Sequence, residues 1–89
     1  MLFMLINQTR SDLSPEEFQR LGELAKAFYA NIPENVTLHA DWAALDRSRT
    51  FALLEADEQG AIEAIQAPFR PYVEIEIIPV RRLSGWEVS

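Results

Sequence analysis

Residues 1–8 read MLFMLINQ, and this segment determines where the rest of the chain must lie. An apolar run opens the segment, and the polar stretch NQTRSD (residues 7–12) follows at once. A short apolar run bounded by turn-forming residues is typical of a β-strand that is buried on both faces. Such a strand needs a neighbour on each side and a layer of protein against each face. The remaining residues must supply those neighbours and layers.

The length and charge of the chain limit both its architecture and its partners. Its 89 residues predict a single domain over 1–89, with 81–89 as a C-terminal tail that has no periodicity. The net charge is −6 and the eight basic residues are scattered, so we expect binding neither to nucleic acid nor to a membrane. Without cysteine and with a single histidine, the chain predicts no metal site and no cofactor. The apolar run lacks a basic segment before it, which favours a soluble cytoplasmic protein over a secreted one.

Two helices are expected. The motif SPEE at residues 14–17 has serine as N-cap, proline at the first helical position and glutamate three residues after the cap. This is the pattern of a capping box. Apolar residues then recur at steps of three and four, which predicts one buried helix face: Phe18, Leu21, Ala25, Phe28 and Ile32. A second, shorter helix is expected from Asp57, as its cap, to Ala67.

Three further segments have the pattern of strands, at residues 36–45, 50–56 and 72–80. The turn DRSR (residues 46–49) joins the first two as a hairpin. The order strand, helix, strand, strand, helix, strand is the ferredoxin-like βαββαβ unit of the α+β class. Right-handed crossovers then predict a four-stranded antiparallel sheet in the order 4-1-3-2, with both helices on one face.

The apolar pattern predicts a second copy of the chain. The strand at 50–56 is also apolar on both faces, whereas the strand at 72–80 carries Glu74 and Glu76 on one face only. Two helices can cover one face of this sheet, so the other apolar face needs a further layer. We expect a homodimer in which two sheets pack face to face. The alternative is that the tail around Trp86 folds back over this face.

The segments MLFMLI, ADWAALDRSRTFALLEAD and VEIEIIPV resemble a family of short bacterial proteins of unknown function. That family is similar to the dimeric α+β barrel proteins, which include muconolactone isomerases, cofactor-free monooxygenases and chlorite dismutases. The resemblance implies a homodimer whose sheets form a barrel. It implies no catalytic residue, and this sequence lacks the multiple histidines that some of the enzymatic relatives use.

Five polar residues on the strands are candidates for a site. Alternation along residues 36–45 places His39 and Asp41 on one face, and Glu74 and Glu76 share a face of the last strand. If both pairs point toward the open face, they frame an apolar floor and form a small-molecule site. Glu55 follows an apolar strand and is expected to face the helices in a structural role. The alternative is that these side chains are solvated and prevent edge-to-edge aggregation.

The sequence therefore favours a small soluble protein that binds a small, partly apolar molecule in a dimeric barrel. A second interpretation is a cofactor-independent isomerase, monooxygenase or decarboxylase that uses His39 as its base. A third is a structural or regulatory interaction module without a reaction. Whether the protein is an enzyme is left open by the residues alone.

Overall fold

The structure is a computed structural model that describes residues 1–83. It contains four strands, two α-helices and one short 3₁₀-helix. In chain order these are β1 (Leu2–Thr9), α1 (Pro15–Ala30), β2 (Val36–Ala43), β3 (Thr50–Ala56), α2 (Gln59–Gln66), η1 (Ala67–Phe69) and β4 (Val73–Val80). The predicted tail residue Trp86 lies outside the described residues.

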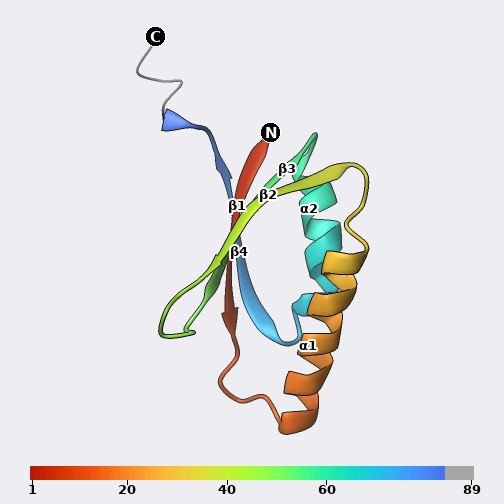
Figure 1. Cartoon of the computed structure of the whole chain (residues 1–89), viewed down its shortest axis with the longest axis vertical. Coiled ribbons are helices and arrows are strands. Elements are labelled where there is room, and N and C mark those ends of the chain that lie inside the picture. Colours follow the sequence, from red (N-terminus) through yellow and green to blue (C-terminus); the bar gives the residue numbers. More distant parts are fainter. Residues whose placement is uncertain (84–89) are drawn as a thin grey trace.

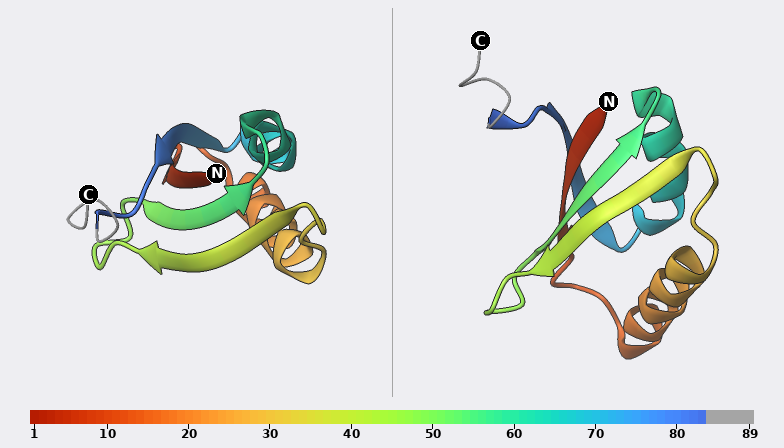
Figure 2. Two further views of the ribbon diagram at one scale, coloured as in Figure 1. Left: turned by 90° about the horizontal axis from the view of Figure 1, so that it is seen from above. Right: turned by 45° about the horizontal axis from the view of Figure 1, so that its top comes forward.

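The four strands form one antiparallel sheet in the order β2-β3-β1-β4. Both α-helices lie on the same face of this sheet (Figures 1 and 2). The ferredoxin-like α+β fold predicted from the sequence is therefore confirmed, with β1 and β3 at the centre. Pro79 lies on the edge strand β4, where a residue without an N–H costs no ladder hydrogen bond.

The capping box predicted at the start of α1 is present. The backbone N–H of Glu17 donates to Ser14 Oγ at 3.2 Å, and the N–H of Ser14 donates to Glu17 Oε1 at 2.9 Å. The second helix departs from its predicted cap, because Glu58 rather than Asp57 occupies the N-cap position and makes no side-chain capping bond.

The hydrophobic core lies between α2 and one end of the sheet. Its buried members are Phe3, Leu5, Val36, Leu54, Ala56 and Ile62. By contrast, α1 contains no fully buried residue, and Phe18 on its predicted inner face is 52% exposed. The sheet surface explains this difference. On the face toward the helices, apolar Phe3 and Leu5 give way to Asn7 and Thr9 along β1, so the end beneath α1 offers fewer apolar partners.

A β-bulge in β2 changes the expected orientation of its side chains. Leu38 pairs with Leu54, but Ala40 pairs with Leu53, so His39 is an extra residue in the ladder. An extra residue reverses the alternation for everything that follows it. As a result Asp41, opposite Ala52, faces the helices. The prediction that His39 and Asp41 share a face is therefore wrong.

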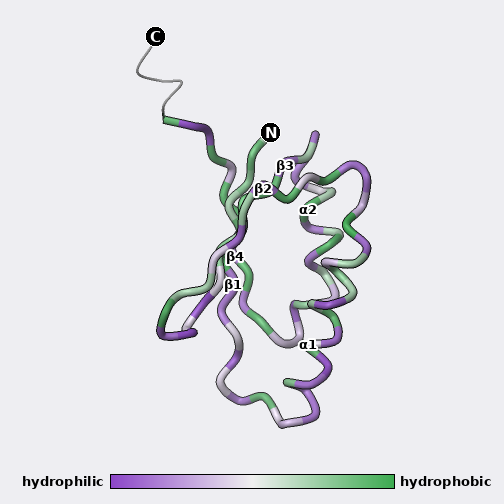
Figure 3. The backbone as a smooth tube through the Cα atoms, in the orientation of Figure 1, coloured by the Kyte–Doolittle hydropathy of each residue, from purple (hydrophilic) through white to green (hydrophobic). Residues whose placement is uncertain are grey.

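The face of the sheet away from the helices, which we call the open face, is largely apolar. It is formed by Leu2, Met4, Ile6, Ala40, Trp42, Phe51, Leu53, Ile78 and Val80. Hydrophobic residues are concentrated along the strands, whereas hydrophilic residues recur along α1 (Figure 3). Most of the open-face side chains are half-buried in the single chain, and Trp42 is 52% exposed. The central strands are thus apolar on both faces, as their sequences predict.

Candidate functional site

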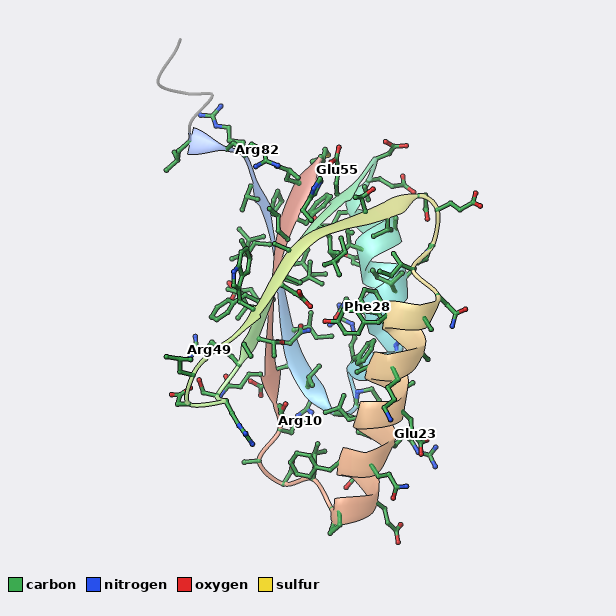
Figure 4. All side chains as sticks on the ribbon, in the orientation of Figure 1. Arg10, Glu23, Phe28, Arg49, Glu55 and Arg82 are labelled. Carbon is green, nitrogen blue, oxygen red and sulfur yellow. The ribbon has the colours of Figure 1, made fainter. Side chains whose placement is uncertain are left out.

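One hollow of the described chain is a cleft between α1 and the sheet, with a volume of about 370 Å³. We call it the α1 cleft. Its walls come from α1, from η1, from the end of α2 and from the strands. Phe28 points from α1 toward the sheet (Figure 4) and makes edge-to-face contacts with Tyr29 and Phe69, at centroid distances of 5.3 and 6.4 Å. These rings give the cleft an aromatic wall.

Two side-chain amides lie at the floor of the α1 cleft. Gln66, the last residue of α2, is only 4% exposed, and Asn7 lies on the central strand β1. Both residues line the cleft. The oxygens Asn7 Oδ1 and Gln66 Oε1 are buried and accept no hydrogen bond. A buried acceptor without a donor costs about 1–3 kcal/mol, so these two oxygens are suited to a donor that arrives with a ligand.

A hydrogen-bonded pair lies at the mouth of the cleft. Tyr29 Oη, near the end of α1, donates to Asp41 Oδ2 on β2 at 2.5 Å, and both side chains are exposed. This bond raises the pKa of Tyr29 to about 12, and partial burial and the negative charge of Asp41 act in the same direction. The phenol therefore remains protonated and hydrogen-bonded to Asp41 throughout the physiological pH range.

His39 and Glu55 form a second pair on the open face. His39 Nε2 lies 2.6 Å from Glu55 Oε1, and the side chains are 31% and 51% exposed. The hydrogen bond from His39 lowers the pKa of Glu55 below its ordinary value. Glu55 was expected to face the helices. It faces away from them because its neighbours Leu53 and Phe51 pair with Met4 and Ile6 on the open face.

Glu74 and Glu76 lie where the alternation of β4 predicts, on the open face. With Arg49 they line a smaller hollow of about 260 Å³ toward the hairpin end of the sheet. Arg49 and Glu55 lie at opposite ends of β3 (Figure 4). The two glutamates are thus separate from the His39–Glu55 pair, and the predicted frame of four polar side chains does not form.

The α1 cleft contains functional candidates that sequence reasoning missed. Of the five predicted residues only Asp41 lines it, together with three polar residues that were not predicted: Tyr29, Asn7 and Gln66. Asn7 could have been predicted from the sequence. It follows the apolar run in phase with Phe3 and Leu5, so it must face the helices if the strand continues. Nothing in the sequence pattern distinguishes Gln66 from a solvated glutamine at the end of a helix.

Two observations bear on other kinds of site. Within residues 1–83, His, Asp and Glu side chains form no group of three or more that could hold a metal ion. None of the helices described here is both long and apolar enough to cross a membrane.

The topology and the cleft beneath one helix define a ferredoxin-like α+β protein with an open second sheet face. The chain belongs to the family described as "Domain of unknown function (DUF3303)", whose model matches residues 1–86. No curated protein matches the chain.

Solved structures share the fold at low sequence identity. A conserved protein from Methanosarcina mazei Go1 is 14% identical with a TM-score of 0.56, and the match covers 91% of this chain and 94% of that one. SCO4226 from Streptomyces coelicolor A3(2) is 17% identical with a TM-score of 0.52, over 92% of this chain and 100% of that one. The crystal structure of an antibiotic biosynthesis monooxygenase is 8% identical with a TM-score of 0.55, over 92% and 100% of the two chains. At these identities the likeness extends to the fold alone.

Proposed function

We propose that this protein binds a small, partly apolar molecule in the α1 cleft. The observation that supports this most directly is the burial of Gln66 Oε1 and Asn7 Oδ1 without donors in one aromatic-walled hollow. Concave apolar sites with a few converging polar groups are the usual form of small-molecule sites, and the volume of about 370 Å³ is within their range. The proposed site is on the helix side of the sheet, whereas the sequence suggested the open face.

A fluorescent probe tests this proposal. The neutral dye N-phenyl-1-naphthylamine is titrated into the full chain and into two variants of α1. Ala25 lines the cleft, so Ala25→Trp fills it and is expected to weaken dye binding at least tenfold. Ala27 is exposed and does not line the cleft, so Ala27→Trp is the matched control and should bind like the parent chain. Equal binding by all three chains would refute the proposal.

We also infer that the protein is a homodimer that pairs through the open face. Its support is the apolar surface on that face, which includes Met4, Phe51 and Leu53 from the two central strands. Exposed apolar patches of this kind usually mark an interface, and a two-fold pairing requires only one kind of surface. Native mass spectrometry of the purified chain reports the number of subunits and any molecule that co-purifies. A dimer without a ligand would favour the interaction module over the binding protein, and a monomer would refute the pairing.

A cofactor-independent enzyme is the second candidate, and the His39–Glu55 pair is the observation that favours it. A histidine held at 2.6 Å by a carboxylate has the arrangement of a general base with its orienting group. The name of one structural neighbour, an antibiotic biosynthesis monooxygenase, agrees with this class of reaction. His39 does not line the α1 cleft, so this enzyme would need a second site on the open face. Loss of turnover in His39→Gln with retained dye binding would support it.

A further inference from the structure

The charge of the α1 cleft restricts what it can bind. Of the residues that line it, Asp41 is the one acidic residue, and none is lysine, arginine or histidine. The net charge of the whole chain, −6, has the same sign. An anion that entered the cleft would meet a like charge and find no basic partner, whereas a cation would be attracted.

Three acceptor oxygens of the cleft lack a hydrogen-bond donor among the described residues. Asn7 Oδ1 and Gln66 Oε1 accept nothing, and Asp41 Oδ1 accepts no hydrogen bond from the described residues. The one phenol at the mouth, Tyr29, already donates to Asp41 Oδ2. A ligand that satisfies this set must therefore bring its own donors, one toward the carboxylate at the mouth and one toward the amides at the floor.

The sheet register fixes how far apart the backbones of Asp41 and Asn7 are. Asp41 lies opposite Ala52, which lies opposite Leu5, and Asn7 is two residues further along β1. Asp41 and Asn7 are thus two strands apart, or about 10 Å in the hydrogen-bonding direction. Phe28, Tyr29 and Phe69 form the aromatic wall of the same cleft. One or two fused rings fill such a gap, and ring faces near a carboxylate also stabilise an organic cation.

From these observations we propose that the α1 cleft is specific for a small aromatic amine, bound as its ammonium ion to Asp41, with a second donor on the ring system directed at Gln66 and Asn7. This specificity rests on the proposed function, because it presupposes that the cleft takes a small molecule. The ammonium group remains at the mouth beside Tyr29 and Asp41, where water reaches it. The ring system lies deeper against the aromatic wall.

Four probes with one indole skeleton test the proposal by isothermal titration calorimetry on the full chain. Tryptamine carries an ammonium and a ring N–H, tryptophol is neutral, indole-3-acetate is an anion, and 1-methyltryptamine lacks the ring donor. We expect tryptamine to bind at least tenfold more tightly than indole-3-acetate and about fivefold more tightly than tryptophol and 1-methyltryptamine. The differences from indole-3-acetate and tryptophol should be largest at low ionic strength, because salt screens an exposed ion pair. The difference from 1-methyltryptamine, which keeps the ammonium group, should not depend on salt.

Variants assign each preference to a side chain. Asp41→Asn should reduce the advantage of tryptamine over tryptophol to less than twofold, and Gln66→Leu should reduce its advantage over 1-methyltryptamine in the same way. Asp46→Asn removes an acidic group from the exposed turn of the same hairpin without touching the cleft, and should leave all four affinities unchanged. If Asp41→Asn does not fold, the salt dependence measured on the parent chain replaces it.

Two failures are distinguishable. If N-phenyl-1-naphthylamine binds and Ala25→Trp prevents it, but indole-3-acetate binds as tightly as tryptamine or salt has no effect, the ammonium specificity is refuted and the binding function stands. If neither the neutral dye nor any indole binds, the proposed function fails and the specificity fails with it.

Discussion

Tyr29 in the last turn of α1 donates its phenolic hydrogen to Asp41 in the middle of β2, at 2.5 Å. Among residues 1–83 this is the one side-chain hydrogen bond between α1 and the sheet. Because α1 has no fully buried residue, the position of the helix depends on this bond and on its half-buried apolar side chains. The width of the α1 cleft is therefore coupled in part to this contact at its mouth.

Removing the hydroxyl of Tyr29 should loosen α1. We expect Tyr29→Phe to lower the free energy of unfolding by about 1 kcal/mol, a small value for a bond to a charged acceptor because the pair is exposed to water. Amide hydrogen exchange in α1 should accelerate more than exchange in β1 or β3, since the substitution releases the helix locally. Urea unfolding and hydrogen exchange measured by mass spectrometry report the two effects.

The matched control for this prediction is Tyr72→Phe. Tyr72 is the second tyrosine of the chain, and its hydroxyl makes no hydrogen bond among the described residues. The control should leave exchange in α1 unchanged. Equal acceleration in both variants, or in neither, would contradict a role of the Tyr29–Asp41 bond in holding the helix.

The same bond should be visible in an alkaline titration. The pKa of Tyr29 is raised to about 12 from the ordinary value of 10. A group whose pKa is raised by folding stabilises the protein fully at pH values below its pKa in the unfolded chain. This contribution is lost as pH rises through its pKa in the folded chain. The contribution of Tyr29 should therefore be intact below pH 10 and lost between about pH 10 and 12.

Ultraviolet absorbance of Tyr72→Phe isolates the ionisation of Tyr29. Its midpoint should lie near 12, and adding Asp41→Asn should move it toward 10, because the hydrogen bond to the carboxylate is the largest cause of the shift. A midpoint near 10 that is insensitive to Asp41→Asn would show that the pair is not formed in solution.

The fold could be predicted from the sequence because the strongest signals are local. The apolar run of β1, the capping box at Ser14 and the alternation in β4 each depend on a few neighbouring residues, and all three are present in the structure. The strand order then followed from the handedness of the crossovers. The extra residue at His39 broke the alternation of β2, and nothing in the sequence pattern signals such a bulge.

The candidate site was predicted less well, for a physical reason. It depends on which side chains from distant segments meet across a gap, and on whether they find partners there. The bulge moved Asp41 to the helix side, where Tyr29 lies, and left His39 beside Glu55 on the open face. Gln66 became a candidate only because it is buried without a donor, which is a property of packing and not of residue type.

The His39–Glu55 pair predicts a stability difference that depends on pH. The hydrogen bond from His39 lowers the pKa of Glu55 from 4.5. A group whose pKa is lowered by folding stabilises the protein at pH values above its pKa in the unfolded chain. This contribution is lost as pH falls through its pKa in the folded chain. The parent chain should thus be more stable than Glu55→Gln above about pH 4.5, and the two should converge below it.

Carbon-detected NMR follows the Glu55 carboxyl directly. In His39→Gln its midpoint should move up toward 4.5, whereas Thr37→Ala, a change on the same strand, should leave it low. Identical midpoints in the parent chain and His39→Gln would exclude this pair as the cause of the shift, and would also remove the observation that favours the enzyme.

The capping box should matter more for α1 than for a well-buried helix. Ser14→Ala removes the acceptor for the N–H of Glu17, and the loss of such a cap costs about 1 kcal/mol of stability. Few buried contacts on α1 can offset that loss. Ser11→Ala, in the preceding loop, makes no side-chain hydrogen bond among the described residues and is the control. Urea unfolding that is identical for the two variants would contradict the prediction.

The open face gives the last prediction, because the single chain and the dimer respond to a charge there in opposite ways. Leu53 lies at the centre of that face, between Met4 of β1 and Ala40 of β2, and is half-buried in the single chain. A carboxylate at this position can reach water when the face is free, so Leu53→Glu should leave the fold intact. Between two packed sheets the same carboxylate would be buried beside its copy at a cost of several kcal/mol.

We therefore expect Leu53→Glu to be a folded monomer by native mass spectrometry and circular dichroism, while the parent chain is a dimer. Ala64→Glu adds the same charge to an exposed position on α2, away from the open face, and should remain dimeric. Dye binding in the α1 cleft should survive in the Leu53→Glu monomer, since the cleft lies on the other side of the sheet. A dimeric Leu53→Glu chain would mean that the copies meet elsewhere, and a monomer that loses the dye would mean that the cleft depends on the partner.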